Sequence, residues 1–317
     1  MKYEKALQRS REYAQDGDVD RAIETIEAFF KGKDEASRLS TYDRATLYLG
    51  HFFRVRGEYE QGLELLHAVA DADGAGEKVR VLALCEAAVI YRLTLRFDEA
   101  EAVLRRAEIR LEGRMTPGED PDQDKVLINF LAARGQLYQY TGRHEEALAD
   151  FRQKLEVIIG RHATADSSHE FITTYMNLYN CHMVLGNRDK ALKYLTLAHA
   201  RLQSLERPYA YGLLTFFENL AIHNLFAAGS QDEAISALAH ISESVVKNFA
   251  DFRKVFDFFS SIIVQLHEGR VDLEVIRDGI REYGADPLIK TYLPVLLGHA
   301  APPGGGEDGN APAATLE

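Results

Sequence analysis

Apolar residues recur three and four positions apart in a series of segments along the chain, with polar and charged residues between them. This spacing gathers the apolar side chains on one face of an α-helix. Short polar turns separate paired segments, as in the stretches YAQDGDVDRAIETI, FFRVRGEYEQGLELL and YQYTGRHEEALADF. The chain lacks the alternation of apolar and polar residues that is typical of strands. The pattern therefore predicts an all-α protein.

A glycine marks the turn between the two segments in five of the six pairs. The turn glycines are Gly17, Gly57, Gly142, Gly186 and Gly229, and Leu95 stands where a glycine would fall between Gly57 and Gly142. Successive gaps between these six positions are 40, 38, 47, 44 and 43 residues. A period of this size belongs to a repeated supersecondary unit, since it is too short for a domain and too long for a heptad. We therefore expect each unit to consist of two helices.

The same residue types recur at fixed distances from each turn. About four residues before the turn the chain carries a bulky side chain: Tyr13, Phe53, Tyr91, Tyr138, His182 or Leu225. Five residues after the turn it carries a small one: Ala22, Gly62, Ala100, Ala147, Ala191 or Ala234. A small residue lets two helices cross closely, and the bulky residue fills the gap beside it. The six matches predict one packing scheme that is repeated along the chain.

This pattern resembles the tetratricopeptide repeat (TPR), whose small residues, turn glycine and aromatic residue at the end of the first helix occupy these positions. The resemblance covers roughly residues 3–245 and implies a right-handed superhelix of about six to seven helical hairpins with a C-terminal capping helix. Lengthened repeats of about 40 residues also occur in kinesin light chains and in bacterial peptide-pheromone receptors of the Rap type. We expect a single solenoid over residues 1–299 and a disordered Gly-, Pro- and Ala-rich tail over residues 300–317.

Composition narrows the classes of partner. The chain has 49 acidic and 37 basic side chains, a net charge of −12, and no dense basic stripe that could neutralise phosphates. Nucleic-acid binding is therefore not expected. No apolar run approaches the ~18 residues of a membrane-spanning helix, and the N-terminal segment lacks the apolar core of a signal peptide. We therefore expect no membrane insertion and a cytoplasmic location, with Cys85 and Cys181 inside the helical core.

The sequence lacks the motifs of common active sites. It contains no phosphate-binding GxxxxGK[ST] and no GxSxG pattern. His144, His169 and His267 each precede a Glu, but none has a second His four residues on, where the two would share the helical face of a zinc site. We therefore expect no enzymatic activity, no cofactor and no bound metal.

The candidate binding surface is the concave face of the solenoid, which the first helix of each unit lines. In the register of the repeats, the candidates for peptide binding on this face are Arg54, Arg92, Asn129, Gln136, Tyr140, Asn177, Asn180, Asn219 and His223. An amide side chain carries both donors and an acceptor, so it can satisfy the backbone of an extended peptide. An arginine on the same face can take a carboxylate. The TPR resemblance implies the peptide-binding role for Asn177, Asn180 and Asn219 in particular.

Several interpretations of these residues remain open. The amides can be surface residues of a solvated concavity, with the neighbouring Met and Phe residues forming the core. If the groove binds, the protein is a non-enzymatic scaffold or adaptor for a protein or peptide partner. The alternative is a peptide-responsive signalling regulator, similar to Rap-type pheromone receptors but lacking an N-terminal effector domain. Self-association through the aromatic run FDFFSS is a further alternative.

Overall fold

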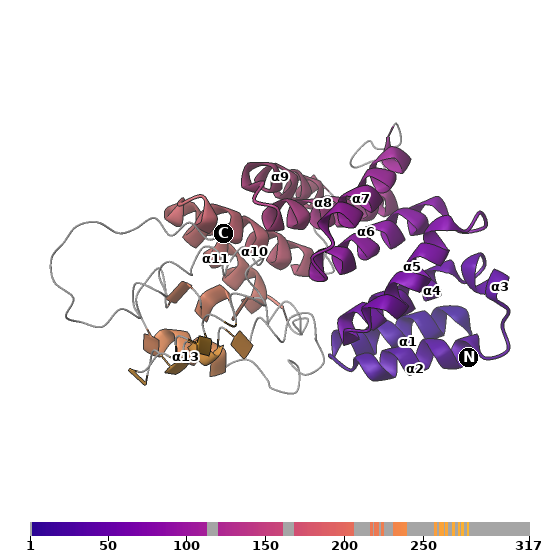
Figure 1. The fold of residues 1–317 in the computed structure, drawn as a ribbon, viewed down its shortest axis with the longest axis horizontal. Helices are drawn as coiled ribbons and strands as arrows, with labels where there is room; N and C mark the ends of the chain where they lie inside the picture. The colour runs from indigo at the N-terminus through magenta and orange to yellow at the C-terminus, as the bar shows by residue number, and fades with distance from the viewer. Residues whose placement is uncertain are drawn as a thin grey trace.

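A computed structural model describes residues 2–112, 120–160, 168–205 and 231–239, with single positions between 216 and 224 and between 257 and 278. Within these residues the regular structure is helical (Figure 1). The helices are α1 (Tyr3–Gln15), α2 (Val19–Phe30), α3 (Glu35–Leu39), α4 (Asp43–Arg56), α5 (Tyr59–Asp71), α6 (Glu77–Leu93), α7 (Phe97–Leu111), α8 (Pro121–Tyr140), α9 (His144–Gly160), α10 (Ser168–Val184), α11 (Arg188–Gln203) and α13 (Gln231–Ala239).

Ten of these helices pack as five hairpins, which pair α1 with α2, α4 with α5, α6 with α7, α8 with α9, and α10 with α11. The sixth predicted turn, at Gly229, lies outside the described residues, although α13 begins soon after it. The predicted capping helix and the tail over residues 300–317 also lie outside the described residues. The short helix α3, which the sequence pattern did not predict, begins after Asp34, whose carboxylate accepts a hydrogen bond from the Ser37 amide over 2.9 Å. The all-α hairpin architecture is confirmed.

The turns lie at the predicted positions, where the first helix of each hairpin is followed by a residue in the left-handed region. Gly17, Gly57, Gly142 and Gly186 have φ between 73° and 88°, and Leu95 has φ 60°. In each turn the next residue donates a backbone hydrogen bond to the bulky residue five positions earlier, as from Glu58 to Phe53 over 2.8 Å. This is the Schellman arrangement that satisfies the last carbonyls of a helix. It explains why the bulky residue and the turn residue keep a constant spacing.

The small residues lie where helices cross. Ala22, Ala100, Ala147, Ala191 and Ala234 have no exposed surface. A Cβ atom on Gly62 would lie 3.1 Å from both the Gly50 carbonyl oxygen and Ile90 Cδ1. The close contacts at Gly62 therefore involve both helices of its own hairpin and the first helix of the next hairpin.

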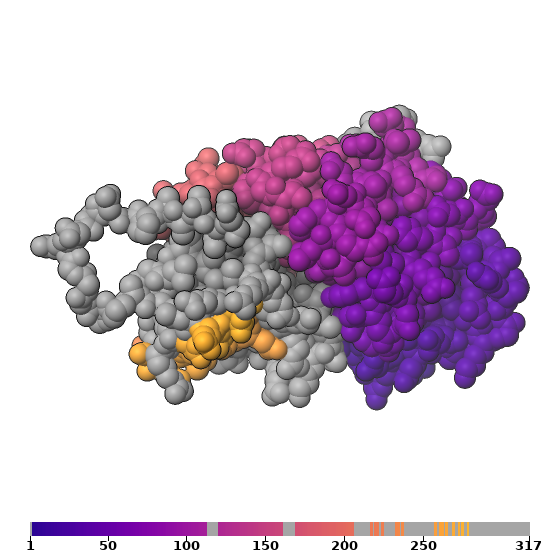
Figure 2. All heavy atoms as spheres, viewed as in Figure 1, coloured from indigo at the N-terminus to yellow at the C-terminus, as the bar shows by residue number. Residues whose placement is uncertain are grey.

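The hairpins stack through two kinds of contact. The second helix of each hairpin packs on the first helix of the next, as α5 does on α6, α7 on α8, and α9 on α10. The first helices also pack on one another, α4 on α6, α6 on α8, and α8 on α10. Helices in the inner layer of a curved stack lie closer together than those in the outer layer, so the first helices form the inner layer. Figure 2 shows the stack from α1 and α2 at the lower right, over the top, to α11 at the left.

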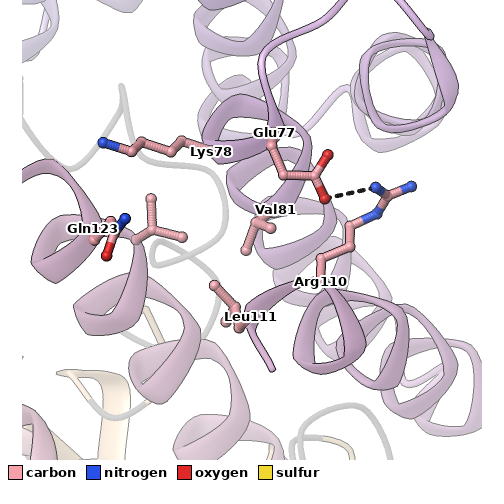
Figure 3. A pocket seen from close by; sticks show the side chains of 7 residues that line it. Glu77, Lys78, Val81, Arg110, Leu111 and Gln123 are labelled. Carbon is pink, nitrogen blue, oxygen red and sulfur yellow. Dashed lines mark hydrogen bonds and ion pairs between the residues drawn. The ribbon is translucent and has the colours of Figure 1, made fainter. Parts of the chain in front are cut away.

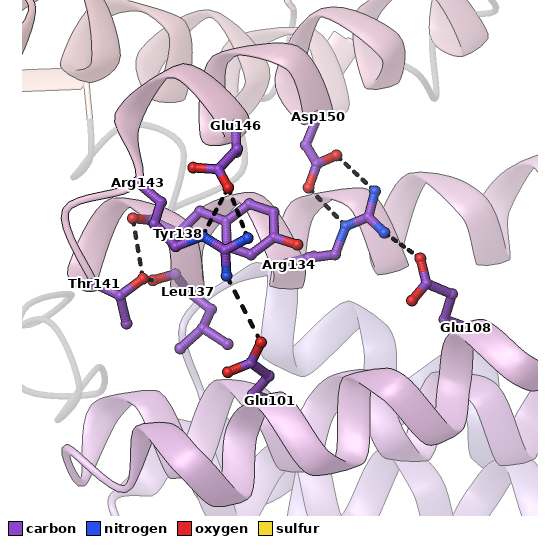
Figure 4. Close-up of polar contacts among 9 residues, drawn as sticks. All are labelled: Glu101, Glu108, Arg134, Leu137, Tyr138, Thr141, Arg143, Glu146 and Asp150. Atoms are coloured by element: carbon purple, nitrogen blue, oxygen red, sulfur yellow. Dashed lines mark hydrogen bonds and ion pairs between the residues drawn. The ribbon is translucent and has the colours of Figure 1, made fainter.

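Ion pairs link the two helices of a hairpin and join neighbouring hairpins (Figure 4). Arg134 on α8 donates to Asp150 on α9 from Nε and Nη2, over 2.9 and 2.8 Å, and its Nη1 donates to Glu108 on α7 over 2.5 Å. A bidentate contact of this kind fixes the orientation of the guanidinium. Because Asp150 is buried, the pair also compensates a carboxylate that would otherwise be costly to enclose.

Candidate functional site

The first contact between inner helices joins α4 to α6. Arg54 Nε donates to Glu86 Oε2 over 3.1 Å, and His51 Nδ1 lies 3.0 Å from the same oxygen. Burial alone would raise the pKa of the Glu86 carboxyl, but the charges and hydrogen bonds of His51 and Arg54 outweigh burial and lower this pKa to about 2. Arg54 therefore already binds a carboxylate that belongs to the protein.

Glu86 is a residue of this surface that the sequence analysis missed. The available signal was a single acidic residue in the apolar run VLALCEAAVI. An ionised residue is rarely placed in such a run unless it is paired.

The next contact joins α6 to α8 and brings two of the predicted groove residues together. The Arg92 guanidinium carbon lies 4.6 Å from the centroid of the Tyr140 ring. Arg92 has 8% of its surface exposed, and its Nε atom has no hydrogen-bond acceptor within the described part of the chain. This stacking leaves the charge of Arg92 without a carboxylate partner among the described residues, unlike that of Arg54.

The third contact joins α8 to α10 through an amide. Gln139 is buried, and its Nε2 atom donates to the Asn177 backbone carbonyl over 3.4 Å and contacts Cys181 Sγ over 3.2 Å. Burial raises the pKa of the Cys181 thiol to about 12, so this cysteine stays a neutral core residue. The side chain of Gln139 thus holds two inner helices together, while Gln136 on the same helix remains half-buried.

The predicted asparagines differ in solvent exposure. Asn177 and Asn180 are half-buried and lie about one turn apart on α10. The Asn180 Oδ1 atom is enclosed and accepts no hydrogen bond from the residues that the structure describes. Asn219 is 1% exposed and offers a partner almost no surface. Asn129 is exposed, but its Nδ2 atom donates to the Lys125 carbonyl of its own helix over 2.8 Å.

His223 lies beside this group and is half-buried. Its ring meets the Tyr179 ring edge-on, with 5.9 Å between centroids. Burial lowers the pKa of His223, so the imidazole is mainly neutral at pH 7. In this state it can offer one donor and one acceptor.

No family model and no curated protein matches the chain. The chain is similar to two crystal structures of the TPR-like repeats of a protein assigned as a kinesin light chain from Podosopora anserina, one of which carries a single substitution. Both are 20% identical to it; the alignments cover 62% and 64% of this chain and 93% and 96% of those chains, with TM-scores of 0.43 and 0.42.

The observation that decides the fold is the stacking of hairpins through left-handed turns and buried small residues. The fold is a TPR-like helical repeat. A TPR-like stack presents an extended surface formed by its first helices, and the side chains described above on α4, α6, α8 and α10 lie on those helices.

Outside this inner surface, the TPR-like stack has a small pocket where α6, α7 and α8 meet (Figure 3). Its volume is about 130 Å³, with Val81, Leu111 and Val126 among its lining residues. Arg110 pairs with Glu77 at its rim over 2.8 Å. A volume of this size is below that of a typical small-molecule site of about 300–1,000 Å³.

The described residues hold no group of three or more His, Cys, Asp or Glu side chains placed to bind a metal ion. Among the described helices, none is both long and apolar enough to cross a membrane.

Proposed function

We propose that the protein is a non-enzymatic scaffold that binds an extended peptide or protein segment along its inner helices. The observation that carries this proposal is the pair Asn177 and Asn180, two half-buried amides on one face of α10. Side chains three residues apart on a helix project together, so both amides can contact the same extended segment.

The state of Asn180 supports this role. None of the described residues donates to its Oδ1 atom, and an enclosed acceptor without a donor destabilises a fold by about 1–3 kcal/mol. A small rotation of the side chain lets a peptide N–H supply the missing hydrogen bond. Binding then recovers free energy that the free protein lacks.

The surroundings favour recognition of the peptide backbone at this point. Gln136 and Tyr140 on α8 lie on the neighbouring inner helix and are half-buried. Amide and phenol groups can each donate and accept, so they suit the alternating N–H and C=O groups of an extended chain. Cytoplasmic location and the absence of catalysis remain parts of the proposal.

The experiment is a selection of displayed peptides on the whole protein, followed by affinity measurements. Asn177→Ala combined with Asn180→Ala is expected to weaken the selected peptides by tenfold or more, as the loss of about two hydrogen bonds implies. Gln153→Ala is the matched control, because it removes an exposed amide from the outer helix α9. Equal affinities for all three proteins would contradict the proposal.

A further inference from the structure

His182 occupies the position before the turn that an aromatic ring holds in the four preceding hairpins. Those rings belong to Tyr13, Phe53, Tyr91 and Tyr138, and an arginine guanidinium lies between 4.0 and 5.5 Å from the centroid of each. The ring at this position therefore contacts a permanent cation in those hairpins. In the α10–α11 hairpin, the ring at this position can itself become the cation, because imidazole titrates near neutral pH.

The packing around His182 favours the neutral imidazole. The residue is 1% exposed, and its ring stacks on that of Tyr194 on α11, with 5.6 Å between centroids and 7° between planes. The Nδ1 atom is enclosed, and it has no hydrogen-bond partner in the described structure. An imidazolium carries a proton on both ring nitrogens, so protonation creates an enclosed Nδ1–H donor that no described group accepts.

The charged groups near His182 also oppose its protonation. Burial lowers the pKa of His182, and the positive charges of Arg152 on α9 and Lys190 on α11 lower it further. The third helix that packs on α10 is α8, which meets it there with the uncharged Gln139. In the described parts of these helices, no carboxylate acts in the opposite direction. The Tyr194 ring attracts a cation, but this attraction is smaller than the penalty for burying one.

We propose that His182 is a pH sensor whose protonation opens the α10–α11 hairpin, since the imidazolium is solvated only when the two helices separate. An exposed histidine has a pKa of about 6.5, so below this pH the opened hairpin binds a proton that the packed hairpin excludes. The hairpin therefore loses stability as the pH falls below about 6.5. Asn177 and Asn180 lie on α10, so opening also separates these amides from the rest of the groove. Only this last consequence rests on the proposed function.

The test is amide hydrogen exchange of the whole protein at pH 7.5 and pH 5.5, measured on proteolytic fragments and corrected for the intrinsic exchange rate at each pH. Protection of α10 and α11 is expected to fall by about threefold or more at the lower pH. In His182→Phe, which places the ring of Phe53 at this position, protection is expected to stay constant. The α1–α2 hairpin contains no histidine and serves as the internal reference in the same samples.

His223 provides the matched control, because it also titrates and its ring contacts Tyr179 on α10. His223→Phe is expected to keep the pH dependence of α10 and α11. A nuclear magnetic resonance titration of the imidazole carbons needs no substitution, and His182 is expected to titrate below the ordinary pKa of about 6.5.

Three results would each overturn the inference. They are a pH dependence that persists in His182→Phe, one that disappears in His223→Phe alone, and a His182 signal that titrates at its ordinary pKa while the hairpin stays protected. These measurements need no bound peptide. Their failure is therefore distinguishable from failure of the proposed function, which is judged by the Asn177 and Asn180 variants.

Discussion

The Arg143 guanidinium lies over the face of the Tyr138 ring, 4.0 Å from its centroid, across the turn between α8 and α9. The same side chain reaches Glu146 on α9 over 2.7 Å and Glu101 on α7 of the preceding hairpin over 3.7 Å. The aromatic residue of one repeat therefore positions a cation that contacts the next helix and the previous hairpin.

Arg143→Ala is expected to lower the free energy of unfolding by only about 1 kcal/mol, because the side chain is 40% exposed and solvent screens its ion pairs. Urea denaturation followed by circular dichroism measures the change. Arg105→Ala removes an exposed arginine from α7 and is the control. Equal effects of the two substitutions would show that the stacking on Tyr138 contributes nothing.

Leu95 is the turn residue whose replacement by glycine is expected to raise the stability of the protein. Its φ of 60° is costly for a side chain with a Cβ atom, and half of its surface is exposed, so little burial is lost on truncation. Leu95→Gly is expected to stabilise the protein by up to about 1 kcal/mol, after the added flexibility of the unfolded chain is deducted. The reciprocal change Gly142→Ala, at φ 79°, is expected to destabilise by a similar amount. Thermal unfolding of both variants shows whether each substitution raises or lowers the stability. A loss of stability in Leu95→Gly would contradict the claim that the backbone at Leu95 is strained.

The helix crossing at Gly135 is expected to tolerate no side chain. A Cβ atom there would lie 2.7 Å from Cε1 of Phe151, whose side chain is fully buried. Gly135→Ala is expected to cost about 1–3 kcal/mol of unfolding free energy. In Gly160→Ala the new Cβ atom meets nothing within 4 Å, so this variant is expected to be neutral or slightly more stable in the same urea titration. If Gly135→Ala left the free energy of unfolding unchanged, α8 and α9 would not be packed this closely.

Lys154 gives the stability of the protein a dependence on pH. Burial lowers the pKa of this 4%-exposed lysine to about 8, although Glu170 acts in the opposite direction. Between pH 8 and the ordinary lysine pKa of about 10.4, the unfolded chain binds the proton that the folded protein has released, so stability rises with pH in this window.

Lys154→Met is therefore expected to be more stable than the parent protein at pH 7, and the difference is expected to shrink as pH rises from 8 to 10. Urea titrations of both proteins at each pH measure this difference, which is at most about 3 kcal/mol. A difference that stays constant over this range would place the ammonium group in contact with solvent.

The turns and helix crossings could be predicted from the sequence because local rules govern them. A left-handed turn favours glycine, and a close helix crossing requires a small residue such as Ala147. Each rule therefore places a recognisable residue type at a constant distance along the sequence of every repeat. The helix α3 was missed because its five residues are too few to show a period. TPR-like stacking was therefore predictable, whereas the connections between hairpins were only partly so.

The polar contacts between hairpins were less predictable. Whether Arg54 meets Glu86 or Arg92 meets Tyr140 depends on the rotation of one hairpin against the next, which packing of the whole stack decides. The sequence placed all of these residues except Glu86 in the candidate groove, but it did not show that Arg54 is already paired. It also gave no sign that Asn219 is 1% exposed.

The central claim is that an extended segment lies along the inner helices at α8 and α10. The most direct measurement is photo-crosslinking of a selected peptide from a benzophenone side chain placed at Gln136 on α8 or, as the outer-layer control, at Gln153 on α9. The account predicts that the peptide is captured from position 136 and not from position 153, and that Asn177→Ala with Asn180→Ala abolishes the capture. Capture from position 153 alone, or capture unaffected by the double substitution, would contradict it.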